Sequence, residues 1–399
     1  FGDAGNDLLD GGDGNDTISA GTGNDIVNGG AGIDLLDLST ATDAVTVNLY
    51  VTTAQTVSAT QGTDTITNIE NVLGGNYNDT LRGTSAANTL TGGAGNDRLG
   101  GLEGNDSVYG GLGNDTMFGD AGNDLLDGGD GNDTIDGGAN DDVMDGGLGN
   151  DTLIGGAGND VLVGRVGNDT YRVGRGTGVD SVTDTDATAG NLDVLNYLGG
   201  VSYNHLWFRH VGNDLEVSVI GTTDKVLVKD WYLSTNNRVE QITTTDGGRV
   251  LLSTQVENLV SAMASMTPPP VGQTSLTVAE QNTLNPVLAA SSGGATSGLV
   301  AHLFKADTAL SISMTTLNIF ICLFSIPIVV NLALLAFLGA ESEIQLPFWQ
   351  TVFQIFSITI IPATLGVWLR RKFPRFADRA GKPIRFVMLG LLAIVFGIK

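Results

Sequence analysis

The chain has 399 residues, 57 of them glycine, and a formal net charge of −25. Residues 1–297 hold 10 Lys/Arg and 40 Asp/Glu, whereas residues 298–399 hold 9 and 4. The acidic part argues against a nucleic-acid partner, because phosphates would be repelled, and it favours cations. With Cys322 as its only cysteine, the chain has no internal disulfide and no cysteine-rich zinc pattern.

A nine-residue repeat occupies most of residues 1–172. One copy reads GGDGNDTID at 128–136; four copies fill 2–37 and eleven more fill 74–172. Glycine permits positive φ, and side chains alternate along a strand, so the apolar eighth residue faces inward. We expect positions one to six to form a turn and positions seven to nine a short strand. Two copies then make one 18-residue coil of an all-β parallel β-roll solenoid.

The sixth position of the repeat carries the candidate metal ligands. Stacked coils bring these like-charged side chains together, and they repel unless a cation lies between them. One buried aliphatic residue per copy contributes about 1.5–3 kcal/mol, against about 1–2 kcal/mol of backbone entropy per residue. The metal-free coil is therefore expected to be unfolded. The candidate ligands are Asp7, Asp16, Asp25, Asp34, Asp79, Asp97, Asp106, Asp115, Asp124, Asp133, Asp142, Asp151, Asp160 and Asp169.

The cation expected between these carboxylates is Ca²⁺, in several copies. Calcium takes six to eight oxygen ligands at about 2.3–2.6 Å and tolerates irregular geometry, whereas Mg²⁺ requires a tighter octahedron. Glycine turns allow backbone carbonyl oxygens to join the carboxylates as ligands. The expected carbonyl ligands belong to Gly93, Gly95, Gly111, Gly113, Gly129, Gly131, Gly147, Gly149, Gly156 and Gly158.

This nonapeptide resembles that of the RTX, or haemolysin-type, calcium-binding repeat family. The resemblance implies calcium-dependent folding, and it implies the C-terminal part of a secreted bacterial protein that meets the type I secretion machinery. Because the chain begins inside a repeat, we expect any catalytic or toxic activity to lie upstream of Phe1.

Several copies depart from the repeat. Asn88 replaces the aspartate, so we expect the copy at 83–91 to bind calcium weakly or not at all. Other departures replace the fourth glycine by Tyr77, Ala86 and Asn140, and the second by Leu102, Asp120 and Arg165.

Three further segments adjoin the repeats. Residues 38–73 alternate Thr and Val and are expected to form strands that continue the coil, as a spacer between repeats 1–37 and 74–172. Residues 173–254 contain short β runs and resemble the β-rich cap that a solenoid needs at its open end. Residues 255–296 are expected to hold one short helix, at about 255–265, and a linker that resembles a secretion-type tail.

Residues 297–399 differ in composition from everything before them. Apolar runs at 309–338 and 347–369 are long enough to span a bilayer, and a third begins at 383, so residues 308–399 are expected in a lipid bilayer. The segment 297–316 resembles the bile acid:sodium symporter family. That resemblance implies that Ser311 and Thr315 help to hold Na⁺, although Ser/Thr hydroxyls also bond within their own helix.

The two halves of the chain call for different compartments. The basic loop at 370–385 favours a cytoplasmic position, which places residues 1–300 in the cytoplasm after two membrane crossings. Extracellular calcium modules need about 10⁻⁴–10⁻³ M Ca²⁺. We therefore expect residues 1–292 to be secreted and residues 297–399 to be in a membrane. We hypothesise that two unrelated pieces join near 293–298, through gene fusion or an assembly artefact.

The sequence bears on three classes of function. Calcium binding and calcium-dependent folding of a secreted protein is the leading prediction. The alternative is a fragment of a sodium-dependent organic anion symporter, which rests on residues 297–399 alone. An enzyme is not expected, because no Gly-x-Ser-x-Gly, His-Glu-x-x-His or Walker motif is present.

Overall fold

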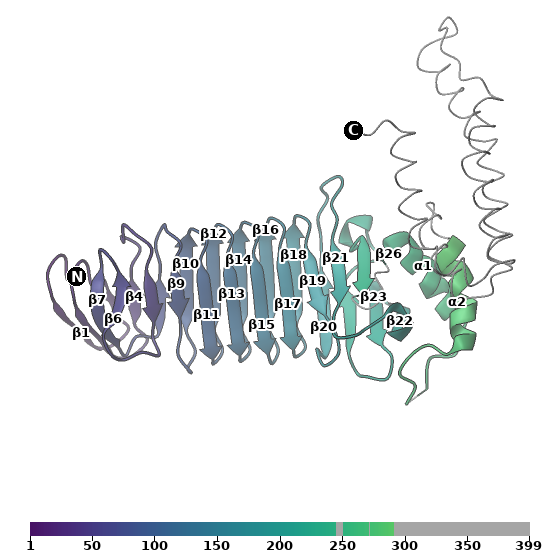
Figure 1. Cartoon of the computed structure of the whole chain (residues 1–399), viewed down its shortest axis with the longest axis horizontal. Coiled ribbons are helices and arrows are strands. Elements are labelled where there is room, and N and C mark those ends of the chain that lie inside the picture. Colours follow the sequence, from purple (N-terminus) through teal and green to yellow (C-terminus); the bar gives the residue numbers. More distant parts are fainter. Residues whose placement is uncertain (245–249, 271, 291–399) are drawn as a thin grey trace, which may run out of the picture. The chain divides into compact units, whose positions relative to one another are not determined.

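The computed structural model describes residues 1–244, 250–270 and 272–290. Residues 1–173 form a parallel β-solenoid, the roll, and residues 174–290 form a β-rich cap with two helices (Figure 1). The solenoid part of the predicted fold class is confirmed. The predicted membrane runs, together with Ser311 and Thr315, lie outside the described residues. Within the described ranges, no helix is long and apolar enough to cross a bilayer.

Three main sheets account for the described strands. One sheet follows the order β1 (Leu8–Asp13), β3 (Ile26–Ala31), β7 (Gly62–Thr67), β6 (Gln55–Ser58). A second follows the order β2 (Thr17–Ile18), β4 (Leu35–Asp37), β8 (Asn71–Leu73), β10 (Thr89–Ala94), β12 (Ser107–Leu112), β14 (Leu125–Asp130), β16 (Val143–Leu148), β18 (Val161–Val166), β20 (Val179–Thr183), β24 (Lys225–Val228), β23 (Asp214–Val219), β22 (Leu206–Val211).

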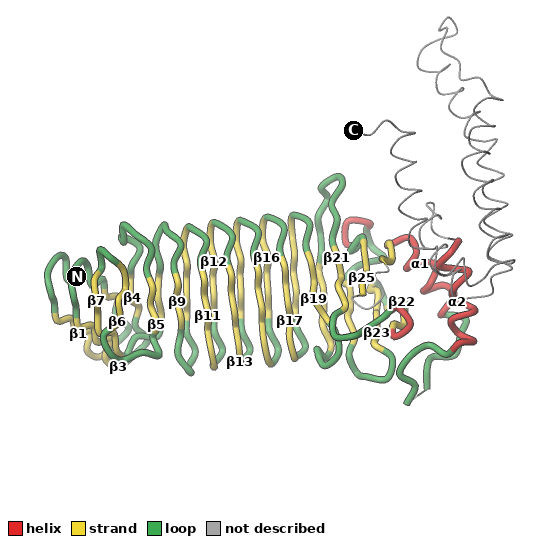
Figure 2. Tube along the Cα trace, in the orientation of Figure 1, coloured by secondary structure: helices red, strands yellow, loops and turns green. Residues whose placement is uncertain are grey.

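The third sheet lies opposite the second across the interior of the roll. It follows the order β26 (Val250–Leu252), β25 (Gln241–Thr244), β21 (Val194–Tyr197), β19 (Thr170–Val173), β17 (Thr152–Ala157), β15 (Thr134–Ala139), β13 (Thr116–Ala121), β11 (Arg98–Glu103), β9 (Thr80–Arg82), β5 (Thr46–Asn48). From β8 to β21, successive strands along the chain therefore alternate between the two long sheets, with the turns along both edges (Figure 2).

The strand register confirms the 18-residue coil. Leu90 pairs with Val108, and Val108 pairs with Leu126. All three are eighth-position residues with 0% exposure, so each copy adds one apolar rung to the core. Parallel pairing of identical positions stacks these rungs and gives the roll a single continuous interior.

The strands are longer than the repeat suggested. β14 begins at position seven of one copy and ends at position three of the next, so only positions four to six turn. The expected six-residue turn is therefore wrong. The reason lies at the second position, where Gly129 pairs with Gly111 and Gly147 at a φ of +98°. A Cβ on Gly129 would collide with the Gly111 carbonyl, and glycine favours the positive φ that continues the ladder at this position. Leu102 and Asp120 adopt the same positive φ in β11 and β13, which are equally long.

The insert at 38–73 forms strands that join the same coils. β7 extends the sheet of β3, β8 lies between β4 and β10, and β5 pairs with β9, all in parallel. β6 departs from this pattern, because it returns antiparallel against β7. The insert thus supplies coil strands although it lacks the glycine repeat.

The cap changes the strand direction and adds bulk to the core. β24 and β25 still pair in parallel with β20 and β21, whereas β22, β23 and β26 pair antiparallel. Large buried side chains fill this part: Tyr197, Leu206, Phe208, Leu215 and Trp231. The short 3₁₀ turns η1 (Tyr203–His205) and η2 (Thr235–Asn237) connect its strands.

Two helices follow the last strand. The predicted helix at about 255–265 is α1 (Ser253–Met263), whose buried face carries Val256, Leu259 and Val260. The expectation of a single helix is wrong, because α2 spans Val278–Ala290. The sequence contains a signal for the start of this helix, in Thr277 and Glu280. The Thr277 hydroxyl accepts a hydrogen bond from the Glu280 amide, and the Glu280 carboxylate accepts from the Thr277 amide. This reciprocal pair is a capping box, T-x-x-E.

Candidate metal sites

The sixth-position aspartates form continuous rows inside the roll. The backbone N–H of Asp115 donates to Oδ1 of Asp133, one coil ahead, at 2.7 Å, and the same bond recurs along the row. One row comprises Asp79, Asp97, Asp115, Asp133, Asp151, Asp169, Asp193 and Glu240. The opposite row comprises Asn88, Asp106, Asp124, Asp142, Asp160 and Asp180.

The first coils repeat this arrangement. Asp7 donates to Asp25 and Asp25 to Asp64, while Asp16 donates to Asp34 and Asp34 to Glu70. The structure therefore brings the predicted aspartates together by coil. From Asp25 onward each aspartate Oδ1 already accepts a backbone N–H, so the remaining chemistry of these carboxylates lies at the other oxygen.

That other oxygen, Oδ2, has no hydrogen-bond partner. Among the described residues, Oδ2 is both buried and unpartnered in thirteen of the fourteen predicted aspartates, with Asp79 the exception. From Asp25 to Asp169 these residues are at most 3% exposed. Burial raises the pKa of Asp97, Asp142 and Asp151 to about 7. Burying an acceptor without a donor costs free energy, so a positively charged partner beside the rows would stabilise the fold.

The first glycine of each copy makes room beside this oxygen. A Cβ on Gly137 would lie 2.5 Å from Oδ2 of Asp142 and 2.8 Å from the carbonyl oxygen of Gly155 in the next coil. A carboxylate oxygen and a carbonyl oxygen therefore face the same small space, which a side chain at position one would fill. Both atoms are hard oxygen acceptors, the donor set that Ca²⁺ prefers.

The carbonyls predicted as ligands from the sequence are those of the second and fourth positions, and that assignment stays a prediction. Second-position glycines such as Gly111 and Gly129 lie in strands. Fourth-position glycines such as Gly113 and Gly131 lie in the turns, at φ values of +125° and +144°. Strand alternation places position one on the inward side with position eight, so a glycine there leaves space beside the carboxylate.

Two copies satisfy their sixth residue without an ion. Oδ2 of Asp79 accepts from the Gly75 amide at 2.7 Å, and its Oδ1 accepts from Val45 at 2.8 Å. Oδ1 of Asn88 accepts from the Thr84 amide at 2.6 Å, and its Nδ2 donates to the Glu70 carbonyl at 2.7 Å. These internal bonds agree with the prediction of weak binding at 83–91.

Five acidic residues outside the repeats take the place of a sixth-position aspartate. They are Asp64, Glu70, Asp180, Asp193 and Glu240, each accepting a backbone N–H from the carboxylate residue one coil before it. Their spacings from their donors range from 20 to 47 residues, so the nine-residue period does not reveal them. The acidic rows therefore continue through the insert, at Asp64 and Glu70, and beyond the last repeat into the cap.

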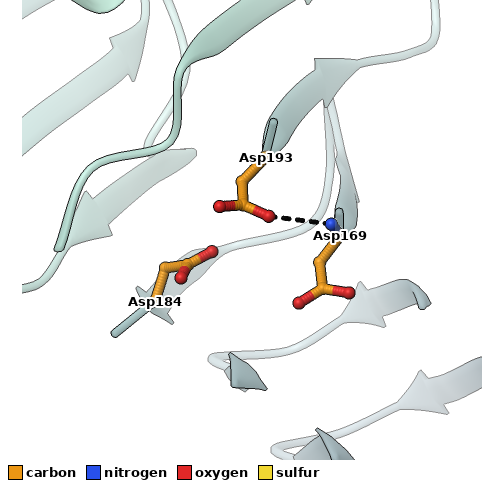
Figure 3. A group of neighbouring side chains, drawn as sticks. All are labelled: Asp169, Asp184 and Asp193. Carbon is orange, nitrogen blue, oxygen red and sulfur yellow. Dashed lines mark hydrogen bonds between the residues drawn. The ribbon is translucent and has the colours of Figure 1, made fainter. Parts of the chain in front are cut away.

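One group of three carboxylates lies where the roll meets the cap (Figure 3). Asp169, Asp184 and Asp193 each offer an oxygen within 4.8 Å of the others, and all three are buried. Burial, before any neighbouring charge, raises the pKa of Asp169 and Asp193 to about 7 and that of Asp184 to about 6.

Comparisons with protein-family models divide the chain into parts. Residues 1–36 and overlapping segments from 73 to 179 match the RTX calcium-binding nonapeptide repeat. Residues 214–249 match the haemolysin-type calcium binding protein related domain. Residues 286–398 match the sodium bile acid symporter family. Both resemblances seen in the sequence are confirmed by these matches.

One solved structure similar to this chain is the extracellular lipase LipA from Serratia marcescens. The two share 20% identity over 40% of this chain and 39% of the lipase, with a TM-score of 0.17. The match therefore spans less than half of the lipase.

Proposed function

Because residues 1–36 and 73–179 carry RTX calcium-binding nonapeptide repeats, we propose that the roll is a calcium-dependent folding module of a type I secreted protein. The observation that supports this most is the set of buried Oδ2 atoms without a donor. Such a series of carboxylates is stable inside a fold when cations lie beside it.

The residues that would hold each ion are the sixth-position aspartate and the first-position glycine carbonyl of the next coil. Asp142 with Gly155 is one such pair. Calcium would supply positive charge to oxygens that share a buried space. An ion that binds only the folded chain adds its binding energy to folding, so ordering of the coils follows the calcium concentration.

Export fits this coupling. Calcium modules that work outside cells have dissociation constants of about 10⁻⁴–10⁻³ M, far above cytosolic calcium. The roll would stay unfolded during passage through a type I secretion system and would fold on reaching extracellular calcium. Any activity of the secreted protein would reside outside the roll.

Circular dichroism tests the proposal directly. Residues 1–292 are titrated with Ca²⁺ and, separately, with Mg²⁺ after exhaustive chelation. We expect a coil-to-β transition with calcium and none with magnesium at the same concentration. Full β structure in excess chelator would contradict the proposal.

The second candidate function rests on the match of residues 286–398 to the symporter family. On that basis the C-terminal part would take a place in a membrane and belong to a sodium-coupled transporter of organic anions. Cells that express the full chain should then show sodium-dependent uptake of a bile acid. Uptake equal to that of cells without the chain would count against it.

The two candidates are compatible with the predicted junction of unrelated pieces near 293–298. Sequencing across that junction on single DNA molecules and on single transcripts tests whether one gene encodes both parts. An uninterrupted gene with a matching transcript would show that one protein contains both parts, and a break in the molecules would separate the two functions.

A further inference from the structure

The group at the end of the roll is built from both sides of a boundary. Asp169 belongs to the last repeat copy, immediately before β19. Asp184 follows β20 directly, and Asp193 directly precedes β21. The segment between them leaves the stack of coils and returns to it, and its two ends place carboxylates next to Asp169 (Figure 3).

This ligand set differs from the rows of the roll. Within the regular copies each coil contributes one carboxylate to a row, but Asp184 adds a further carboxylate beside Asp169 and Asp193. Their exposures are 0%, 1% and 0% for Asp169, Asp184 and Asp193. Asp184 and Asp193 lie beyond the last repeat copy, so the nine-residue pattern does not identify them.

Neutral donors reach all four oxygens of Asp184 and Asp193 and leave Oδ2 of Asp169 without a donor. The Tyr171 hydroxyl donates to Oδ2 of Asp184 at 3.0 Å, and the Asn191 amide donates to Oδ2 of Asp193 at 2.6 Å. No described ion pair includes any of the three aspartates. Oδ2 of Asp169 and Oδ1 of Asn191 remain buried without a partner.

We propose that Asp169, Asp184 and Asp193 hold a hard divalent or trivalent cation, Ca²⁺ in the native protein, that fastens the cap to the last coil. The Asn191 amide holds Asp193 from the side by its Nδ2 hydrogen bond. The assignment rests on the proposed calcium-binding function of the roll but uses residues outside its repeats.

The chemistry of the group predicts the order of filling. Three carboxylates attract a cation more strongly than the single carboxylate and carbonyl that each regular copy offers, since calcium affinity rises with ligand charge. The site at the boundary should therefore fill at lower calcium than the rows. Its occupation would order residues 184–193 against β19 before the rest of the roll is complete.

Tyr171 provides a readout that is local to this site. Its ring is buried and its hydroxyl contacts Asp184, so a lanthanide in the site would lie beside a phenol. Tb³⁺ replaces Ca²⁺ in oxygen sites and emits strongly when a nearby tyrosine is excited. The full chain, kept soluble in non-ionic detergent, is titrated with Tb³⁺ under tyrosine excitation.

Three variants are compared with the wild type. Asp184→Asn removes one carboxylate from the boundary site and leaves the repeats intact. Asp130→Asn makes the same change at an exposed third position of a repeat, where other copies carry Ala or Leu. Tyr171→Phe keeps all three carboxylates and removes the phenol.

In the wild type we expect an early, tyrosine-sensitised phase of Tb³⁺ emission. Asp184→Asn should reduce that phase at least fivefold, and Asp130→Asn should leave it unchanged. Tyr171→Phe should lose the emission but still bind the same number of calcium ions by equilibrium dialysis. An early phase of full amplitude in either Asp184→Asn or Tyr171→Phe would overturn the proposal.

The same preparations separate this inference from the proposed function. If calcium drives the coil-to-β transition but Asp184→Asn changes nothing, the boundary site is wrong and the roll proposal stands. If the early phase depends on Asp184 but no transition follows at any calcium concentration, the boundary site stands and calcium-dependent folding of the roll is wrong.

Discussion

The roll and the cap stabilise their interiors in different ways. The roll adds one apolar rung per nine residues and buries a carboxylate beside each rung. The cap packs large side chains such as Phe208 and Trp231, and it contains four of the five ion pairs in the described residues. In the cap, Lys229 lies 2.5 Å from Asp214, so that carboxylate is neutralised by the chain itself.

This difference shows where the metal is needed. A buried carboxylate with a cationic neighbour is stable without an added ion, whereas one without such a neighbour disfavours the fold. The roll contains a single described ion pair, Arg165–Asp145, and it lies on the surface rather than beside the rows. The fold of the cap should therefore depend less on bound calcium than the fold of the roll does.

Chelation should produce the largest effect. Excess chelator is expected to remove amide protection throughout the strands from β10 to β18, while β22 and β23 keep most of theirs. The reason is that the cap has a conventional apolar core and its own countercharges. Hydrogen exchange followed by mass spectrometry measures both regions in one sample. Simultaneous loss of protection in roll and cap would show that the two are not independent.

Replacing one carboxylate inside a row should have the next largest effect. Asp133→Asn keeps an oxygen for the Asp115 amide but removes the charge beside Gly128. We expect the calcium midpoint for folding to rise by roughly threefold to tenfold, on the order of 1 kcal/mol. Circular dichroism against calcium concentration measures the shift. Asp130→Asn is the matched control, and an equal shift in both variants would refute a special role for position six.

Acidity should weaken calcium binding by the roll. Burial raises the pKa of Asp97 and Asp151 to about 7 and that of Asp106 and Asp133 to about 6, so in the metal-free fold these groups hold protons more tightly than in the unfolded chain. Protons therefore favour the metal-free fold at low pH, and that contribution is lost as pH rises through about 6–7.

Calcium competes with these protons. Its apparent affinity is expected to fall several-fold between pH 8 and pH 5.5, with protons released on binding at the lower pH. Calorimetry in buffers of different ionisation enthalpy counts the released protons. A pH-independent affinity with no proton release would mean that the bound carboxylates are already charged in the metal-free chain.

A change confined to the cap should have the smallest effect. Thr277→Ala removes the hydroxyl that accepts from the Glu280 amide at the start of α2, a loss of about 1 kcal/mol for a helix cap. Amide protection of α2 should decrease while the calcium midpoint of the roll stays the same. A shifted midpoint would show that the helices contribute to closing the roll.

Much of the roll could be read from the repeat. The apolar residue at position eight and the aspartate at position six recur every nine residues, so a stack of coils follows from strand alternation alone. The second helix could also have been read, because Thr277 and Glu280 stand in capping-box spacing. The length of the strands was harder to predict, since glycine inside a sheet is unusual and the positive φ at position two is paired only with the same position of the stacked coils.

The sequence by itself determined the period, the inward residues and the identity of the repeated carboxylates, because these depend on local alternation and on glycine's backbone freedom. Only the tertiary structure decided which acidic residues continue the rows. Asp193 and Glu240 lie 24 and 47 residues beyond their hydrogen-bond donors, Asp169 and Asp193. Irregular segments of the cap bring these two residues back to the same edge of the stack. Because the lengths of those segments follow no period, a periodic pattern in the sequence cannot predict the contacts.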